Sequence, residues 1–141
     1  PDENKPTKLM AANFDPNPAL ELLLDNPVRS NSFKMEIESP KKDAEIKIKN
    51  GKITFPLSGI IKSINGGTTD KKFQAYLFSN KKEDYEKFQP IWQSDLTIDE
   101  TEADFSFSTT INLSVVPGLY YYLIEDENGD QLYAIGRIQM K

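Results

Sequence analysis

The sequence contains neither cysteine nor histidine. Without cysteine the chain forms no disulfide and no thiolate metal site. Without histidine it lacks the commonest zinc ligand and the side chain that most often moves protons near neutral pH. We therefore expect no metal ion and no other cofactor, and only carboxylates remain as acid–base groups. These absences argue against most classes of enzyme.

The chain also lacks an excess of basic residues and any long apolar run. Its 17 lysines and arginines are outnumbered by 22 aspartates and glutamates, which gives a formal net charge of −5. Nucleic-acid binding requires clustered positive charge, so a nucleic-acid partner is not expected. No apolar stretch approaches the roughly 20 residues of a membrane-spanning helix. We expect a single domain, without a transmembrane segment in the chain given, because 141 residues suffice for one hydrophobic core.

The N-terminal region differs in composition from the rest. Residues 1–18 are rich in proline and poor in apolar side chains, which is typical of a flexible tether. The domain itself is expected to span residues 19–141. Residues 19–24 suit either a short helix or an edge strand, because Pro18 and Pro27 limit the segment on both sides. Since the chain begins at Pro1 and not at methionine, we expect that a preceding segment, such as a signal peptide, has been removed.

Alternation of apolar and polar residues dominates the remainder of the chain. From Phe105 to Leu113 every second residue is apolar except Thr109, the pattern of a half-buried strand. Residues 73–78 and 119–124 are apolar on both faces, which predicts central strands that need cover on both sides. Further strands are predicted at residues 33–37, 46–48, 52–61 and 92–98, and a single helical turn over the end of the sandwich at 80–89. Seven or eight short strands predict an all-β fold, an antiparallel β-sandwich of the immunoglobulin-like or fibronectin-like kind.

Two Asn-Gly pairs set the predicted strand register, because this dipeptide favours the type I′ turn of a tight hairpin. The turn at residues 50–51 predicts three cross-strand pairs: Ile46 with Phe55, Ile48 with Ile53, and Lys49 with Lys52. The turn at residues 128–129 predicts pairs on both faces of the last hairpin: Ile124 with Tyr133, Tyr122 with Ile135, Tyr121 with Gly136, and Leu123 with Ala134.

Carboxylates are the remaining candidates for catalysis. Two acidic groups stand out, at residues 99–102 and at residues 126–130. Both lie in predicted loops, whereas a general acid needs burial or a close like charge. A small carboxylate-dependent hydrolase is therefore the weakest alternative. The segment 126–130 fits a hairpin turn better than a calcium-binding loop, since it lacks the regular ligand spacing.

Aromatic side chains are the other candidates for function. Flat rings such as Trp92 and Tyr133 suit stacking on a sugar, which would make the chain a carbohydrate-binding module of a cell-surface glycan system. The competing prediction is that Trp92 fills the core, because its alternation partners are apolar. Tyr121 and Leu123 share the second face of their strand. That face is a docking patch if it is bare, and part of the core if a neighbouring segment covers it.

Two separated segments carry a family resemblance. One is DNPVR at residues 25–29 followed by the strand at 33–37, and the other is INLSVVPGLY at residues 111–120 together with GRIQMK at 136–141. They resemble the opening, the closing hairpin and the basic last strand of the C-terminal sorting domains carried by cargo of the type IX secretion system of Bacteroidetes. The penultimate strand is also similar to that of fibronectin type III and related immunoglobulin-like modules of secreted bacterial proteins. The resemblance implies a small immunoglobulin-like sandwich of an exported protein.

The resulting hypothesis is a non-catalytic recognition or sorting module located outside the cytoplasm. It would be secreted or held at the cell surface, for example as a lipoprotein, and would bind a protein or a glycan there. Docking is expected at an exposed strand edge and at the last hairpin, residues 119–141. The predicted contact residues are Trp92, Tyr121, Leu123, Tyr133, Arg137 and Lys141.

Overall fold

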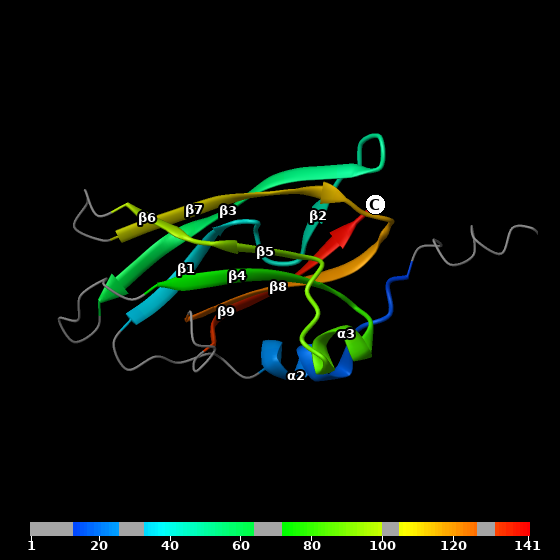
Figure 1. The fold of residues 1–141 in the computed structure, drawn as a ribbon, viewed down its shortest axis with the longest axis horizontal. Helices are drawn as coiled ribbons and strands as arrows, with labels where there is room; N and C mark the ends of the chain where they lie inside the picture. Colours follow the sequence, from blue (N-terminus) through cyan, green and yellow to red (C-terminus); the bar gives the residue numbers. More distant parts are fainter. Residues whose placement is uncertain (1–12, 26–32, 64–71, 100–104, 127–131) are drawn as a thin grey trace, which may run out of the picture.

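The computed structural model of the chain describes residues 13–25, 33–63, 72–99, 105–126 and 132–141, and these residues form two β-sheets stacked as layers (Figure 1). One sheet has four strands in the order β1 (Phe33–Ser39), β3 (Lys52–Ser63), β7 (Phe105–Ser114) and β6 (Thr97–Asp99). The other has five strands in the order β2 (Ala44–Ile46), β9 (Leu132–Met140), β8 (Gly118–Asp126), β4 (Phe73–Ser79) and β5 (Trp92–Asp95). The prediction of a mostly β fold is confirmed.

The structure has nine strands in its described residues, against the seven or eight predicted, partly because one predicted strand changes sheets. The segment 92–98 begins as β5 beside β4 and continues as β6 beside β7. Leu96 stands between the two strands, is buried, and donates its backbone N–H to the carbonyl of Phe73 over 3.1 Å. Alternation continues through such a crossing, so the sequence pattern alone did not reveal it.

The predicted turn at residues 50–51 is confirmed, but the predicted pairing of the two strands on either side of it is wrong. Asn50 and Gly51 both have positive φ, at 54° and 76°, as a type I′ turn requires. Lys49 lies opposite Lys52 as predicted. The preceding β2, however, pairs in parallel with β9 in the other sheet, so Ile46 lies beside Met140 and not beside Phe55. The chain leaves the hairpin after one pair because it crosses between the sheets.

The main core lies between the two sheets. Its fully buried members come from the inner faces of both layers: Ile53, Leu57, Ile61, Phe73, Leu77, Ile111, Ile124 and Ile138. Strand β8 is buried on both faces, as predicted, because Tyr120, Tyr122 and Ile124 belong to this core. Its alternate residues Leu119, Tyr121 and Leu123 belong to a second apolar cluster on the outer face of the five-stranded sheet.

The last hairpin is shifted by one residue relative to the prediction. Glu125 lies opposite Leu132, as a turn at residues 128–129 requires, although that turn itself lies outside the described residues. An irregularity then moves the register, so that the remaining pairs join Ile124 with Ala134, Leu123 with Ile135, Tyr122 with Gly136, and Tyr121 with Arg137. The four predicted pairs are therefore wrong. The physical reason is a β-bulge, which lets the adjacent residues Tyr133 and Ala134 both enter the core.

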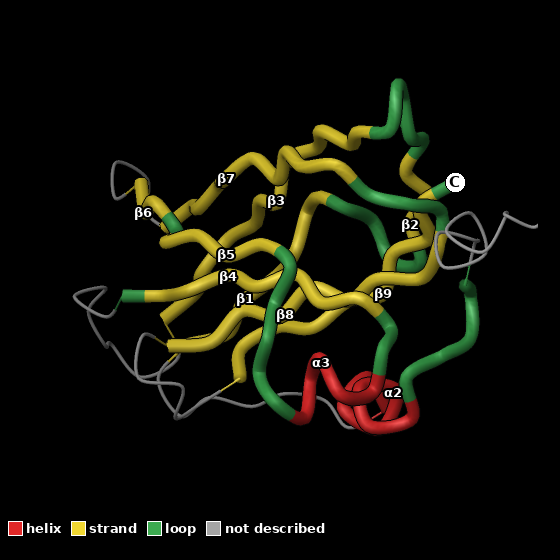
Figure 2. Tube along the Cα trace, turned by 45° about the vertical axis from the view of Figure 1, so that its right-hand side comes forward, coloured by secondary structure: helices red, strands yellow, loops and turns green. Residues whose placement is uncertain are grey.

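A short helix, α2 (Pro18–Asp25), covers the outer face of the five-stranded sheet (Figure 2). Asn17 caps it, because its side-chain oxygen accepts the backbone N–H groups of Ala19 and Leu20 over 3.0 and 3.3 Å. Pro18 occupies the first helical position, where proline is favoured. Residues 19–24 are thus helical, and residues 13–18 of the predicted tether contact the domain. Residues 1–12 lie outside the described part of the chain.

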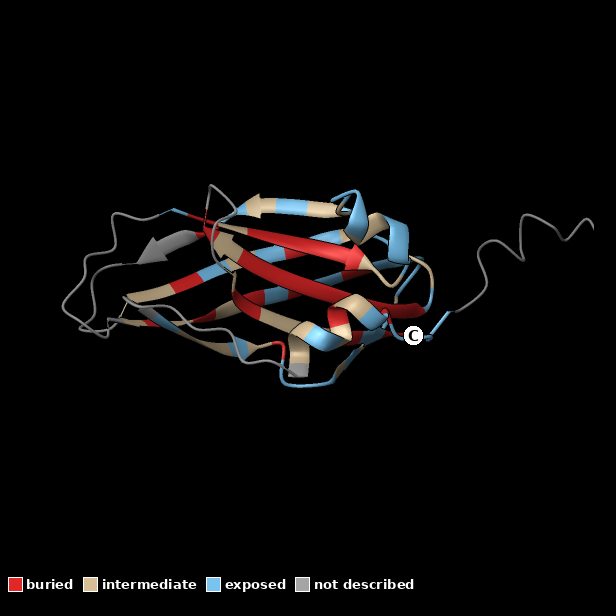
Figure 3. Ribbon diagram, turned by 90° about the horizontal axis from the view of Figure 1, so that it is seen from below, coloured by how far each residue is buried: buried red, intermediate tan, exposed pale blue. Residues whose placement is uncertain are grey.

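The segment after β4 forms a second helix, α3 (Lys82–Glu86), next to α2 on the same face (Figures 1 and 2). The predicted helical turn is confirmed, but it lies against the outer face and not over an end of the sandwich. Tyr85 and Phe88 meet the ring of Phe78 edge-on, with ring centroids 5.6 and 5.3 Å apart. Figure 3, which looks onto this face, shows the buried strands lying behind the helices.

Candidate functional site

Polar contacts fix α2 to strand β8. The hydroxyl of Tyr121 accepts the backbone N–H of Asn17 over 3.1 Å and donates to the Glu21 carboxylate over 2.6 Å. Tyr121 is completely buried. Burial, and next the hydrogen bond to Glu21, raise the pKa of the Tyr121 hydroxyl above its usual value. The hydroxyl is thus held protonated as a link between the sheet and the helix.

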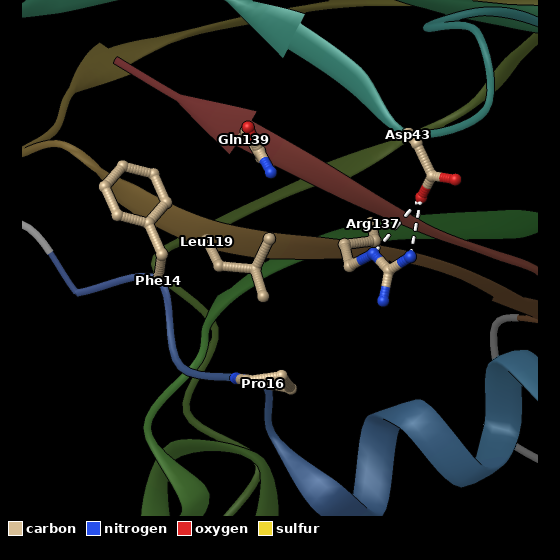
Figure 4. A pocket seen from close by; sticks show the side chains of 6 residues that line it. All are labelled: Phe14, Pro16, Asp43, Leu119, Arg137 and Gln139. Carbon is tan, nitrogen blue, oxygen red and sulfur yellow. Dashed lines mark hydrogen bonds and ion pairs between the residues drawn. The ribbon is translucent and has the colours of Figure 1, made fainter.

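Arg137 of β9 extends this network to the turn before β2. Its guanidinium donates to both carboxylate oxygens of Glu21 over 2.8 and 2.9 Å. It also donates to Asp43 through two nitrogens over 2.9 and 3.1 Å, as Figure 4 shows. These hydrogen bonds, first to Asp43 and then to Glu21, raise the pKa of the guanidinium. One side chain thereby holds three elements together: the helix, the last strand and the corner between β1 and β2.

Two hollows flank Arg137. The smaller, of about 220 Å³, lies towards the N-terminal segment, where Phe14, Pro16 and Leu119 contribute to its wall (Figure 4). The larger, of about 440 Å³, lies between α2, β9 and the β1–β2 corner, and we call it the β9 groove. Its apolar lining is Leu24, Ile37, Pro40, Tyr122 and Ile135. Its charged lining is Glu21, Lys41, Lys42, Asp43 and Arg137.

The floor of the β9 groove is formed where Tyr122 passes under Gly136. Any Cβ atom at position 136 would overlap the Tyr122 ring, so this close approach requires glycine. The ring is buried, and burial raises the pKa of Tyr122 to about 12. The groove is therefore floored by an aromatic ring that belongs to the main core.

One wall of the β9 groove is an open strand edge. Strand β2 pairs with β9 only at residues 138–140. Strand β1 lies close to β9, but no other described strand pairs with residues 132–137 on that side. Lys141 directs its N–H and C=O towards β2, where they bond to Ile46 and Ile48 over 3.1 and 3.0 Å. Alternate residues of a strand face the same side, so Ile135 and Arg137 direct their backbone groups towards the groove.

The groove carries a local excess of positive charge. Glu21 and Asp43 are paired with Arg137. Lys41 and Lys42 are exposed, and neither forms an ion pair with any residue that the structure describes. At neutral pH the five charged side chains of the lining sum to +1 in a chain whose net charge is −5. An anionic group is thus favoured at this place although the chain as a whole is negatively charged.

Of the predicted contact residues, only Arg137 lies in the β9 groove. Tyr121 and Leu123 are completely buried under α2, which covers the face predicted as a possible docking patch. Tyr133 is in the main core, where it meets Phe73 edge-on, and its buried hydroxyl has no hydrogen-bond partner among the described residues. Lys141 is exposed and paired with Glu45 over 3.1 Å.

Trp92 and the other aromatic residues do not form a flat, exposed set in the described structure. Trp92 is half-buried and packs against the main core. On the outer face, Phe88 is exposed but meets Tyr76 edge-on, with the ring planes at 77°. The coplanar arrangement that sugar stacking requires is thus not formed by these ring pairs.

The acidic groups considered for catalysis fall largely outside the described residues, which exclude residues 100–104 and 127–131. Of the rest, Asp126 is buried, and the pKa of Glu125 is raised, first by burial and then by Asp126. No group of three potential metal ligands is found within the described ranges. Neither α2 nor α3 is long and apolar enough to cross a membrane.

The sequence did not predict most of the residues that line the β9 groove. Glu21 and Arg137 are 116 positions apart, and Asp43 and Arg137 are 94 apart. No periodic pattern connects charges at such separations. The only available signal was the Asn-Pro pair before residue 19, which indicates a helix start and would have placed Glu21 in a helical first turn.

Comparison with known proteins adds no family to this description, since no family model and no curated protein matches the chain.

Proposed function

We propose that this chain is a non-catalytic recognition module that binds a partner protein along the open edge of β9. The observation that carries the proposal is the β9 groove, in which backbone groups of Ile135 and Arg137 without a strand partner among the described residues lie beside an apolar lining. A strand edge that borders a groove is a known mode of peptide recognition, because backbone hydrogen bonds give affinity and side-chain pockets give specificity. This edge belongs to the last hairpin, which the sequence already indicated as the docking element.

The fold supports this proposal, since we assign it to the immunoglobulin-like sandwiches. The four-stranded sheet has the strand order A-B-E-D of such domains if β1, β3, β7 and β6 are taken as those strands. In the same scheme β8 is strand F. The hydroxyl of Tyr120, near the start of β8, donates to the carbonyl of Val116 over 2.7 Å, which corresponds to the tyrosine corner of this class.

We further propose that the module acts outside the cytoplasm, at the cell surface or after secretion. The support is the similarity of residues 25–37, 111–124 and 136–141 to sorting domains of exported proteins. Fractionation of the producing cells, followed by detection of this domain, tests the location. Recovery of the domain only from the cytoplasm would rule it out.

Site-specific photo-crosslinking tests the docking site. A photoreactive residue at position 42 should give a discrete adduct with a surface protein of the producing cells. The same residue at Ser108, exposed on the far sheet, is the matched position and should give none. Equal adducts from both positions would contradict the proposal.

Two variants of one residue then test the strand edge. Ile135→Pro removes a backbone N–H that faces the groove, a position where a strand tolerates proline. Ile135→Ala removes the same side chain but keeps the N–H. We expect the crosslink at position 42 to persist in Ile135→Ala and to be lost in Ile135→Pro, with circular dichroism showing that both variants fold.

The sorting version of the proposal needs a gentler test than removal of the last strand, because β9 pairs with both β2 and β8 and its loss would disrupt the sheet. Lys141→Gln removes the terminal positive charge, whose partner Glu45 is itself exposed. If the hairpin is a sorting signal, this variant should be retained in the periplasm although it folds. Normal surface display would leave the hairpin as a structural and docking element only.

A further inference from the structure

The open edge of β9 in the groove is closed at one end, where β2 begins. On the basis of the proposed function, we propose that it binds the carboxy-terminal segment of the partner protein as an extended strand parallel to β9, with the terminal carboxylate at Lys41 and Lys42. This proposal names the partner's chemistry and orientation, which strand-edge docking alone leaves open.

The length of the open edge indicates that the bound segment of the partner, called the guest strand, ends where β2 begins. Among the described residues, no strand pairs with residues 132–137 of β9 on the groove side, but from Ile138 onwards β2 occupies the same edge. The turn before β2 brings Asp43 to Arg137, which closes the groove at the level where β2 begins. A guest strand that follows the edge towards β2 therefore meets Lys41 and Lys42 and must stop or turn away.

The charges indicate which end of the guest lies there. Strand β9 runs towards β2, so a parallel guest has its C-terminus at the β2 end and an antiparallel guest has its N-terminus there. Lys41 and Lys42 have no carboxylate partner among the described residues, whereas Arg137 already has two, Glu21 and Asp43, so the net positive charge of the lining comes from the two lysines. A terminal carboxylate is attracted to this place and a terminal amine is repelled. The parallel arrangement is thus the favoured one.

The apolar lining indicates the side chains of the guest. Successive side chains of a strand point to opposite faces, so every second guest residue faces the lining that Leu24, Ile37 and Ile135 provide. The volume of about 440 Å³ lies within the range of small-ligand sites, roughly 300–1,000 Å³. An alternating guest with β-branched apolar residues fits both the edge and this lining.

Fluorescence anisotropy with defined peptides tests the proposal. The probe is an N-terminally fluorescein-labelled hexapeptide of alternating threonine and valine with a free C-terminal carboxylate, and its control is the same peptide with a C-terminal amide. We expect the amide to bind roughly tenfold more weakly, the effect of losing one favourable charge contact. Amide NMR shifts on titration should be largest at Ile135 and Arg137.

Charge reversal provides the matched protein variants. Lys41→Glu with Lys42→Glu should abolish binding of the carboxylate peptide. Lys47→Glu with Lys49→Glu changes the same number of exposed lysines, neither of which lines the groove, and should leave binding unchanged. All four side chains are exposed, so neither double variant is expected to disturb folding.

The outcomes separate this inference from the proposed function. Equal binding of the carboxylate and the amide, or equal loss in both lysine variants, would overturn the carboxylate assignment while leaving strand-edge docking in place. Absence of any peptide binding would also overturn the inference. Only loss of the position-specific crosslink would contradict the proposed function itself.

Discussion

The two faces of β8 are buried in different ways. On the inner face, Tyr122 and Ile124 pack against a whole opposing sheet through apolar contacts. On the outer face, Leu119, Tyr121 and Leu123 are covered mainly by two short helices. The inner contact joins extensive strands, whereas the outer contact depends on α2, which is anchored by hydrogen bonds from Tyr121 and Arg137 to Glu21.

Because of this difference, we expect the two sheets to be more stable than the helices that cover the outer face. Eight residues are too few for a helix to persist alone in water, so α2 exists because it is docked. Segments of this kind open locally at a free energy below that of global unfolding. Since Glu21 and Leu24 of α2 line the β9 groove, the shape of this proposed docking site depends on the less stable cover.

The largest effect is expected on the inner face. Ile111 is completely buried between the sheets, and Ile111→Ala should lower the free energy of global unfolding by about 4 kcal/mol through lost burial and the cavity left behind. Urea denaturation followed by circular dichroism measures this loss. Ser108→Ala, on the exposed side of the same strand, should change stability by less than about 0.5 kcal/mol. Similar losses in both variants would contradict the assignment of the two faces.

Alkaline pH should weaken the inner face next. Burial raises the pKa of Tyr122 to about 12, while an exposed tyrosine titrates near 10. Between these values the unfolded chain has lost the proton and the folded chain keeps it, so the free energy of unfolding falls as pH rises. This contribution is fully present below about pH 10 and is lost, about 3 kcal/mol in all, as the pH rises from 10 to above 12.

The Tyr122→Phe variant isolates this contribution from that of the other tyrosines. Urea denaturation at several pH values should give a slope that is shallower by about 1.4 kcal/mol per pH unit in the variant. Parallel pH profiles for the wild type and the variant would show that Tyr122 is not the titrating group.

The outer face should respond more weakly and more locally. Tyr121→Phe removes the hydroxyl that joins Asn17 and Glu21, and we expect a loss of about 2 kcal/mol because one partner is charged. Hydrogen exchange should show the loss first at the amides of α2, while the strands stay protected. Tyr122→Phe at neutral pH is the control, since the Tyr122 hydroxyl has no hydrogen bond to any described residue. Uniformly faster exchange in the strands would contradict a separable cover.

The same contrast explains what could be predicted from the sequence. The inner face was predictable because alternation in β7 and the two-sided apolar run in β8 record which side chains are buried. The turn at residues 50–51 was predictable because its backbone demands particular residues. These signals are local, because none of them depends on which strand lies next to the segment.

The wrong predictions concern which strands lie side by side, and not which side chains are buried. Ile46 and Ile48 alternate as expected and do pack against the core, yet β2 belongs to the opposite sheet. A bulge lets Tyr133 and Ala134 enter the core together, which no strict period-two pattern anticipates. The β9 groove was not foreseen, because it arises where Glu21, Asp43 and Arg137 meet from three distant parts of the chain.

The smallest effect is expected at Arg137, which joins β9 to α2 beside the proposed docking groove. Arg137→Lys keeps the positive charge, but one ammonium group cannot reproduce the paired hydrogen bonds to Glu21 and Asp43. Because the site is partly exposed, the loss in global stability should be only about 1 kcal/mol. Exchange of the α2 amides should nevertheless rise more than that of any strand. Asp43→Asn, which removes only the more exposed pair, should leave α2 protected, so faster exchange there would show that the β1–β2 corner, and not Glu21, holds the helix in place.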